Sequence, residues 1–353
     1  MSERYPVAGS GKREAGRGTR EAGRLLDTAW TDSQFGHPVS GGVNGQCRSC
    51  SGATCDTAPM NRRKFLALSA GAGAAGLVGT KEVGAETARE QEIDRDPRSS
   101  FKLSVTRWPY REFSLDQLSK MARELGLNSV ELLEPNEWEI PRRYGLICAM
   151  GYATVPDPST RLTQGFNRVE NHAWLIPAYE RAIPLAAASK VPNLICFSGN
   201  RAGISDNEGR ENCARGLAPL LPLAAKHGVN LCMELLNSRI DHPDYQCDHT
   251  VWGVAFAKQL GSDSFKLLYD IYHMQIMEGD VIRTVRDNHR YIGHYHTGGV
   301  PGRHEIDSSQ ELNYPAIMRA IAESGFTGHV AQEFVPTRDP RASLAEAVRL
   351  CRV

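Results

Sequence analysis

The chain of 353 residues has no excess of charge of either sign, because 41 Lys and Arg residues balance 41 Asp and Glu residues. Proteins that bind nucleic acid usually carry a basic patch or a strongly basic composition, so nucleic acid is not an expected partner. After its first hundred residues the sequence also lacks an apolar run long enough to span a bilayer. We therefore expect a small polar molecule as the partner, and no membrane span in the mature protein.

The nine cysteines lack the arrangement of a disulfide framework. Cys47, Cys50 and Cys55 lie in a leader rich in Gly and Ser, with no histidines at zinc-binding spacing, which disfavours a metal site there. Other cysteines fall in apolar runs, and these are expected to be small buried residues: Cys148, Cys196 and Cys232.

The first hundred residues differ in composition from the rest. Residues 1–59 have no apolar periodicity and are expected to be disordered. Residues 60–85 begin with Met60, continue with the pair Arg62-Arg63 and a short apolar run, and end in small residues. This order is typical of a twin-arginine export signal, whereas a structural helix here would be weakened by four glycines. Residues 86–100 are polar and are expected to form a linker.

The leader has two consequences for where the protein is made and found. Translation could start at Met1 or at Met60, and a start at Met60 would leave residues 1–59 untranslated. An export signal predicts a periplasmic protein that uses the twin-arginine export machinery. If residues 60–85 are instead a short structural helix, the protein is expected in the cytoplasm.

Residues 101–353 alternate short β-rich runs with longer helical patterns, which is typical of βα units and a parallel sheet. The sequence predicts an α/β protein with a (β/α)₈ TIM barrel fold, for which about 250 residues suffice. The predicted strands are Lys102–Val105, Ser129–Leu132, Leu146–Met150, Asn193–Phe197, Asn230–Glu234, Phe265–Asp270, Tyr291–His296 and His329–Glu333. The predicted helices are Leu115–Leu125, Val169–Ser189, Glu208–His227, His249–Leu260, Asp280–Asn288, Tyr314–Glu323 and Ser343–Leu350, with a poor helix near Glu137–Arg143.

A doubly wound open sheet is the alternative fold. No G-x-G-x-x-G turn follows the first predicted strand, which counts against a dinucleotide-binding version of that fold. Helices that end in glycine just before the next strand, as at Gly228 and Gly261, fit either alternative.

The last four predicted strands each end in a side chain that can bind a metal. These residues are Glu234, Asp270, His296 and Glu333. Because the carboxyl ends of barrel strands meet at one face of the fold, we expect the four side chains to converge. Carboxylates and imidazole suit Mn²⁺, Mg²⁺, Co²⁺ or Zn²⁺, and three facing carboxylates without a cation would repel one another. The sequence therefore predicts a site for one divalent metal ion, with Mn²⁺ or Mg²⁺ favoured.

Four further residues are candidates for substrate binding. His273 follows Asp270 by three positions and is expected on the loop over the barrel mouth. Arg303 lies in a glycine-rich loop and could grip a carboxylate or hydroxyl groups with two hydrogen bonds, although a solvated loop arginine is the alternative. Asn237 lies in the loop after Glu234, and Trp108 lies beyond the first strand, where it could form a wall of the pocket.

Other polar residues near these loops are weaker candidates. His294 shares a strand face with His296, and His296 is preferred as the ligand because it is nearer the strand end. Further residues could line the pocket or be solvated: Asn200, Arg201, Arg239, His242, Tyr245, His304, Glu305 and Asp307.

Four sequence blocks resemble the xylose-isomerase-like TIM barrel superfamily, particularly its hydroxypyruvate isomerases and the neighbouring ketose 3-epimerases. The blocks are Met-Glu-Leu-Leu-Asn-Ser-Arg (233–239), Tyr-Asp-Ile-Tyr-His-Met-Gln-Ile-Met-Glu-Gly-Asp (269–280), Gly-His-Tyr-His-Thr-Gly-Gly-Val-Pro-Gly-Arg-His-Glu-Ile-Asp (293–307) and Gln-Glu-Phe-Val-Pro (332–336). The resemblance implies that the four strand-end residues bind one divalent metal. It also implies that Glu234 and Glu333 act as acid and base, and that His273 and Arg303 hold substrate oxygens.

The chain departs from this pattern at two positions. The epimerases carry a further acidic residue where this chain has Ile240, and hydroxypyruvate isomerases often have Gln at the position of His296. The resemblance therefore supports the fold and the metal site more strongly than the substrate.

The expected function is isomerisation of a small α-hydroxy carbonyl compound, with hydroxypyruvate to tartronate semialdehyde as the first candidate reaction. Alternatives are a sugar 3-epimerase or other carbohydrate isomerase, a metal-dependent lyase or dehydratase, and an exported sugar-binding protein without catalysis. A DNA-repair nuclease is disfavoured by the neutral charge and by too few histidine ligands. The sequence leaves the oligomeric state open, including a homo-oligomer.

Overall fold

The computed structural model describes residues 100–353, and the structure of this part is treated by itself. The predicted disordered leader (1–59), the predicted export signal (60–85) and all but the last residue of the predicted linker (86–100) lie outside the described residues. They stay predictions.

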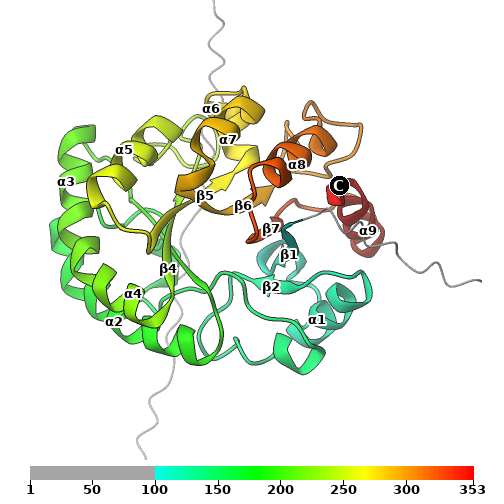
Figure 1. Cartoon of the computed structure of the whole chain (residues 1–353), viewed down its shortest axis with the longest axis horizontal. Coiled ribbons are helices and arrows are strands. Elements are labelled where there is room, and N and C mark those ends of the chain that lie inside the picture. The colour runs from blue at the N-terminus through cyan, green and yellow to red at the C-terminus, as the bar shows by residue number, and fades with distance from the viewer. Residues whose placement is uncertain (1–99) are drawn as a thin grey trace, which may run out of the picture. The chain divides into compact units, whose positions relative to one another are not determined.

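Parallel strands form the centre of the described part, and helices surround them (Figure 1). The strands are β1 (Lys102–Thr106), β2 (Ser129–Glu131), β3 (Asn193–Cys196), β4 (Asn230–Leu235), β5 (Phe265–Asp270), β6 (Ile292–Thr297) and β7 (His329–Gln332). Their order in the sheet is β2-β1-β7-β6-β5-β4-β3, and every neighbouring pair is parallel. This arrangement confirms the predicted α/β TIM barrel class.

The third predicted strand, Leu146–Met150, is wrong as a regular strand. Residues 147–151 occupy the position between β2 and β3, but only isolated parallel bridges join them to these neighbours, with Ile147 opposite Ser129 and Gly151 opposite both Leu133 and Leu194. The ladder is interrupted at Ala149, whose N–H donates to Ser129 Oγ and whose carbonyl accepts from the Asn193 side chain. Side chains thus replace backbone partners there, and these bridges close the gap between the two edge strands.

The helices in the described part follow the predicted order with three differences. They are α1 (Leu115–Glu124), α2 (His172–Ala188), α3 (Asp206–Leu217), α4 (Leu221–His227), α5 (Thr250–Leu260), α6 (Ile271–Met277), α7 (Val281–Asn288), α8 (Tyr314–Glu323) and α9 (Pro340–Cys351). The predicted helix 208–227 is divided by a 3₁₀ turn, Ala218–Leu220, where Pro219 and Pro222 lack the amide hydrogen of a continuous helix. The weak helix near residues 137–143 is only a 3₁₀ turn, Pro141–Tyr144.

The third difference is α6, which the sequence analysis took for a loop. It begins directly after β5, because the Asp270 carboxylate accepts hydrogen bonds from the N–H groups of Tyr272 and His273 and so caps the first turn. The glycines expected after α4 and α5 do end these helices, since Gly228 and Gly261 have φ values of +64° and +59°. No helix in the described part is both long and apolar enough to cross a membrane.

The cysteines of the described part are all buried and free. Cys148, Cys196 and Cys232 are at most 1% exposed, which confirms that they are small core residues. Burial raises the pKa of the Cys232 thiol to about 12, so this side chain stays neutral inside the barrel. Cys47, Cys50 and Cys55 lie outside the described residues.

Candidate active site

Four residues from neighbouring strands meet at the carboxyl end of the barrel. Glu234 lies in β4, Asp270 ends β5, His296 lies in β6, and Glu333 directly follows β7. All four side chains are buried, and one ligand atom from each lies within 4.8 Å of the others. The structure therefore brings together the four residues that were predicted to share one metal ion.

The donor set of this four-residue cluster fits a divalent cation. His296 Nδ1 lies 2.6 Å from Glu333 Oε2 and 3.3 Å from Glu234 Oε1. It makes no well-aligned hydrogen bond in the described part of the chain, although it is buried. Three carboxylates and one such imidazole nitrogen are the donors that Mn²⁺, Mg²⁺, Co²⁺ and Zn²⁺ accept.

Burial and the mutual charges move the pKa values of the four-residue cluster in different directions. Burial raises the pKa of Asp270 to about 7 and also raises the pKa of Glu234, because a desolvated carboxylate favours its neutral form. Burial acts likewise on Glu333, but the charges of His296 and Arg303 hold its pKa well below the usual value. Burial alone would lower the pKa of His296, but the charge of Glu333, the hydrogen bond to Glu131 and the close contacts with Glu234 and Glu333 raise it well above the usual value.

Arg303 reaches the four-residue cluster from the loop after β6. Its Nη2 donates to Asp270 Oδ2 at 2.9 Å and to Glu333 Oε2 at 2.6 Å. The guanidinium lies 5.2 Å from the ring centres of both Trp108 and Tyr272, which restricts its plane. It is therefore not a solvated loop arginine, since only 14% of its side chain is exposed.

His273 lies on α6 rather than on a loop, and it is fully buried. The Asn237 amide donates to His273 Nδ1 at 2.7 Å and to Asp241 at 2.6 Å, while the Asn237 carbonyl oxygen accepts two backbone N–H groups. Burial lowers the pKa of His273 well below its usual value, so the ring is neutral. Arg303 Nη1, which can only donate, lies 3.0 Å from the other ring nitrogen, Nε2.

The four-residue cluster opens into a cavity of about 610 Å³. Trp108, Glu234, Arg303 and Glu333 line this cavity, and Trp108 Nε1 donates to Glu333 Oε1 at 2.7 Å. Trp108 thus forms a wall, as expected, whereas the other two predicted substrate-binding residues, Asn237 and His273, are fully buried and are not among the lining residues. Several other lining residues carry no signal in the sequence: Arg107, Arg111, Leu132, Glu134, Tyr152, Arg161 and Phe197.

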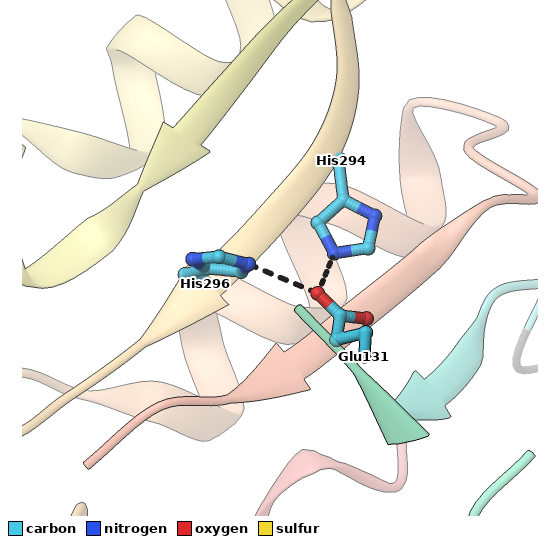
Figure 2. Close-up of side chains that lie close together, drawn as sticks. All are labelled: Glu131, His294 and His296. Carbon is cyan, nitrogen blue, oxygen red and sulfur yellow. Dashed lines mark hydrogen bonds and ion pairs between the residues drawn. The ribbon is translucent and has the colours of Figure 1, made fainter. Parts of the chain in front are cut away.

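Glu131 is a further buried polar residue that the sequence analysis missed. It ends β2 and accepts hydrogen bonds from both His294 and His296 (Figure 2). Burial alone would raise its pKa, but the charges of the two histidines and their hydrogen bonds lower it to about 2. The sequence carries only a weak signal for it, because Glu131 is the last residue but one of the predicted strand Ser129–Leu132 and the structure ends β2 one residue earlier. His294 itself contacts Glu131 and is not part of the four-residue cluster.

Most of the weaker candidates lie outside the four-residue cluster. Only His242 among them lines the cavity. The buried Tyr245 hydroxyl donates to the backbone carbonyl of Glu234, and Arg201 forms an ion pair with Asp248. Arg239 and His304 are exposed and bond to backbone carbonyls.

Glu305 connects the loop that carries Arg303 to the residues after β7 through hydrogen bonds. Its carboxylate accepts hydrogen bonds from Thr337 N, Thr337 Oγ1 and Ser343 Oγ, each at 2.8 Å. Burial alone would raise its pKa, but these hydrogen bonds lower it to about 2. The folded protein therefore gains stability from the ionised Glu305 above about pH 4.5, and this contribution is lost as the pH falls from 4.5 toward 2.

We expect Glu305→Gln to lower the free energy of unfolding by roughly 1–3 kcal/mol at pH 7, because a charged acceptor of three buried hydrogen bonds is lost. The difference in the free energy of unfolding between the variant and the unsubstituted protein should become smaller as the pH falls below 4.5. Urea unfolding between pH 7 and pH 3 measures this, with Glu311→Gln, an exposed carboxylate of the same loop, as the control. A difference that stays constant with pH would contradict the assigned role of the carboxylate charge.

Solved structures show the same fold at low sequence identity. A crystal structure of D-psicose 3-epimerase with D-fructose matches 70% of this chain and 90% of its own with a TM-score of 0.55 and 18% identity. A structure of the IOLI protein with a bound zinc atom matches 71% of this chain and 95% of its own with a TM-score of 0.56 and 15% identity. At these identities the likeness concerns the fold alone.

Curated relatives have higher identity. A human protein (Homo sapiens), named provisionally as a hydroxypyruvate isomerase, is 27% identical over 247 residues, which cover 68% of this chain and 82% of the relative. A protein of Cupriavidus necator named 2-oxo-tetronate isomerase is 37% identical over 121 residues, covering 34% of this chain and 46% of the relative. The family model described as "Xylose isomerase-like TIM barrel" matches residues 87–352. The chain therefore belongs to the xylose isomerase-like TIM barrel family.

Proposed function

We propose that this chain is a divalent-metal-dependent isomerase of a small α-hydroxy carbonyl compound, and that the first candidate reaction converts hydroxypyruvate to tartronate semialdehyde. The observation that carries the proposal is the four-residue cluster of Glu234, Asp270, His296 and Glu333 at the floor of a cavity. The names of the human and Cupriavidus necator relatives support an isomerase of a hydroxy-keto acid.

The reaction moves one proton between neighbouring carbon atoms and one between the oxygens that these carbons carry. A carboxylate removes a proton from the carbon beside the substrate carbonyl, and the resulting enediolate takes up a proton at the former carbonyl carbon. Glu234 and Glu333 both line the cavity, so we assign this proton transfer to them. A divalent ion held by the four-residue cluster would supply Lewis-acid polarisation of the substrate oxygens.

Arg303 is placed to bind an oxygen of the substrate, because it lines the cavity. Its Nη1 also lies 3.0 Å from Nε2 of the buried His273, so this ring helps to hold the guanidinium. The guanidinium has further N–H donors, and a carboxylate or carbonyl oxygen of the substrate can accept hydrogen bonds from them. Asn237 would serve indirectly, because its amide bonds to the His273 ring.

The proposal is tested by deuterium uptake. Purified protein is incubated in D₂O with Mn²⁺ or Mg²⁺ and a panel of hydroxypyruvate, four-carbon 2-oxo acids and ketoses, and exchange of the carbon-bound proton is followed by NMR. We expect solvent deuterium in the substrate and in the product for at least one hydroxy-keto acid. Product that lacks one water would instead indicate a lyase or dehydratase, and no exchange with any compound would favour a non-catalytic sugar-binding protein.

A sugar 3-epimerase is the second candidate. The cavity of about 610 Å³ is much larger than a three-carbon acid requires, and its lining includes Tyr152, Arg161 and Phe197 beyond the four-residue cluster. The structural likeness to a D-psicose 3-epimerase adds only the shared fold. The same panel separates the two candidates, because an epimerase would exchange the proton at C3 of a ketose and leave hydroxypyruvate unchanged.

A further inference from the structure

Glu131 connects two histidines of β6 to the opposite side of the barrel. Its Oε1 lies 2.7 Å from His294 Nε2 and 3.0 Å from His296 Nε2, and all three side chains are fully buried. Figure 2 shows both contacts converging on this single oxygen. β2 and β6 are separated by β1 and β7 in the sheet, so Glu131 reaches the histidines through the barrel interior.

The two contacts are the only side-chain hydrogen bonds of the Glu131 carboxylate in the described part of the chain. Glu131 Oε2 and His294 Nδ1 have no hydrogen-bond partner among the described residues. A buried carboxylate without compensation is strongly unfavourable, so the pair of imidazole N–H groups is what holds it there. Conversely, nothing else among the described side chains bonds to Nε2 of His296.

The direction of these hydrogen bonds determines which nitrogen of His296 faces the four-residue cluster. A carboxylate only accepts hydrogen bonds, so the Nε2 atoms of both histidines donate to it. In the neutral ring, which a cation requires, the lone pair is then on Nδ1 of His296, the atom 2.6 Å from Glu333 and 3.3 Å from Glu234. Without an acceptor at Nε2, the ring could rotate or carry its proton on Nδ1, where it would block a cation.

We propose that Glu131 is a positioning residue that holds His296 with Nδ1 directed into the four-residue cluster, and that His294 holds Glu131 in place. The arrangement matches the carboxylate–histidine–metal relays in which an outer carboxylate orients a metal ligand, and loss of such a partner typically weakens metal binding by about 10–100-fold. The inference rests on the proposed function, since it concerns the metal assigned to the four-residue cluster.

A second metal ion held by Glu131, His294 and His296 is the competing explanation. These three side chains do form a group whose ligand atoms lie within 4.8 Å of one another. However, the atoms that would face such an ion already bond to one another at 2.7 and 3.0 Å. An ion there would have to displace the Nε2 protons of both histidines. His296 would then have to coordinate two ions, one through each ring nitrogen.

The test measures Mn²⁺ affinity and stoichiometry by the electron paramagnetic resonance of free Mn²⁺. The unsubstituted protein should bind one ion per chain. Glu131→Gln keeps the size and one acceptor oxygen, so binding should weaken by a few fold, whereas Glu131→Met keeps the size without an acceptor and should weaken binding by about 10–100-fold. His329→Gln is the matched control, because His329 is buried and stacks beside His294 at 6.5 Å without bonding to Glu131, and it should bind like the unsubstituted protein.

A spectroscopic measurement separates positioning from a general loss of stability. In zinc-loaded protein with ¹⁵N-labelled histidine, the unsubstituted chain should show a downfield Nε2–H proton of His296, assigned by its loss in His296→Gln. Glu131→Met should remove this signal, and Glu131→Gln should retain it at a changed position. If Glu131→Met fails to fold, Glu131→Gln still carries both measurements.

The outcomes distinguish the two proposals. Equal Mn²⁺ affinity in the unsubstituted protein and both Glu131 variants would overturn the positioning role and leave the proposed function intact. Two ions per chain, with one lost in the Glu131 variants, would also overturn it in favour of the second site. If the unsubstituted protein binds neither Mn²⁺ nor Zn²⁺, this result would contradict the proposed metal-dependent function. It would contradict the positioning role of Glu131 as well.

Discussion

Glu333→Gln is expected to lower kcat for the isomerisation by about 10²–10⁴-fold, the range that removal of a general acid or base usually produces. Glutamine has the same shape and can still accept the hydrogen bond from Trp108 Nε1. It cannot take up a proton, and it removes the negative charge that faces His296 Nδ1 and Arg303 Nη2. The change therefore removes chemistry while it preserves most of the packing.

The control for Glu333→Gln must also remove a buried carboxylate. Asp248 is 4% exposed, pairs with Arg201 at 2.9 Å and does not line the cavity, so Asp248→Asn should retain kcat within a few fold. Initial rates are measured at rising Mn²⁺ concentrations, so that weaker metal binding is separated from slower chemistry. A kcat for Glu333→Gln close to that of Asp248→Asn would sink the assignment of Glu333 to proton transfer.

The four-residue cluster could be predicted because a short apolar run that ends in Glu, Asp or His is visible in the sequence without any three-dimensional information. The carboxyl ends of all strands in a parallel barrel lie on one face. A correct prediction of the barrel fold therefore also places four residues near one another: Glu234, Asp270, His296 and Glu333. Glu131 also lies at the carboxyl end of its strand, β2. Its side chain, however, bonds to the two histidines of β6 and not to the residues that carry the other carboxylates.

Two features of the fold depend on contacts that have no local pattern. The third predicted strand is interrupted because Ser129 and Asn193 bond to Ala149, and such side-chain partners come from distant segments. Helix α6 exists because Asp270 caps it, so one carboxylate serves both as a predicted ligand and as a helix cap. An acidic residue at a strand end can be a helix cap or a metal ligand, and the sequence pattern does not show that Asp270 caps a helix that includes His273.

The roles of Asn237 and Arg303 also depend on tertiary contacts. The sequence placed Asn237 near the pocket, but its amide is fully used by Asp241, His273 and backbone N–H groups. Arg303 lies between two aromatic rings that are 164 residues apart in the chain, Trp108 and Tyr272. Loop composition cannot specify such contacts, because they form only when the barrel brings the loops together.

Removal of divalent metal by a chelator is expected to abolish activity, with a loss of about three orders of magnitude or more, since metal polarisation of an oxygen contributes several kcal/mol. The metal-free protein should also be less stable than the metal-loaded protein. Among the described residues, Arg303 and His296 are then the positively charged partners of the three carboxylates of the four-residue cluster. The pKa of Asp270, raised to about 7 by burial, reflects the cost of keeping a third buried charge there.

Restoring the metal gives the second measurement. Mn²⁺ at about 100 times its Kd should stabilise the folded chain by about 2.7 kcal/mol, which corresponds to a rise in Tm of roughly 5–10 °C for a domain of this size. Asp270→Asn should lose most of this rise, because it removes a ligand, whereas Asp248→Asn should retain it. The same Tm with and without Mn²⁺, together with full activity after chelation, would contradict a metal site at these four strand ends. An unchanged Tm with lost activity would instead indicate that the substrate, rather than the protein alone, completes the coordination.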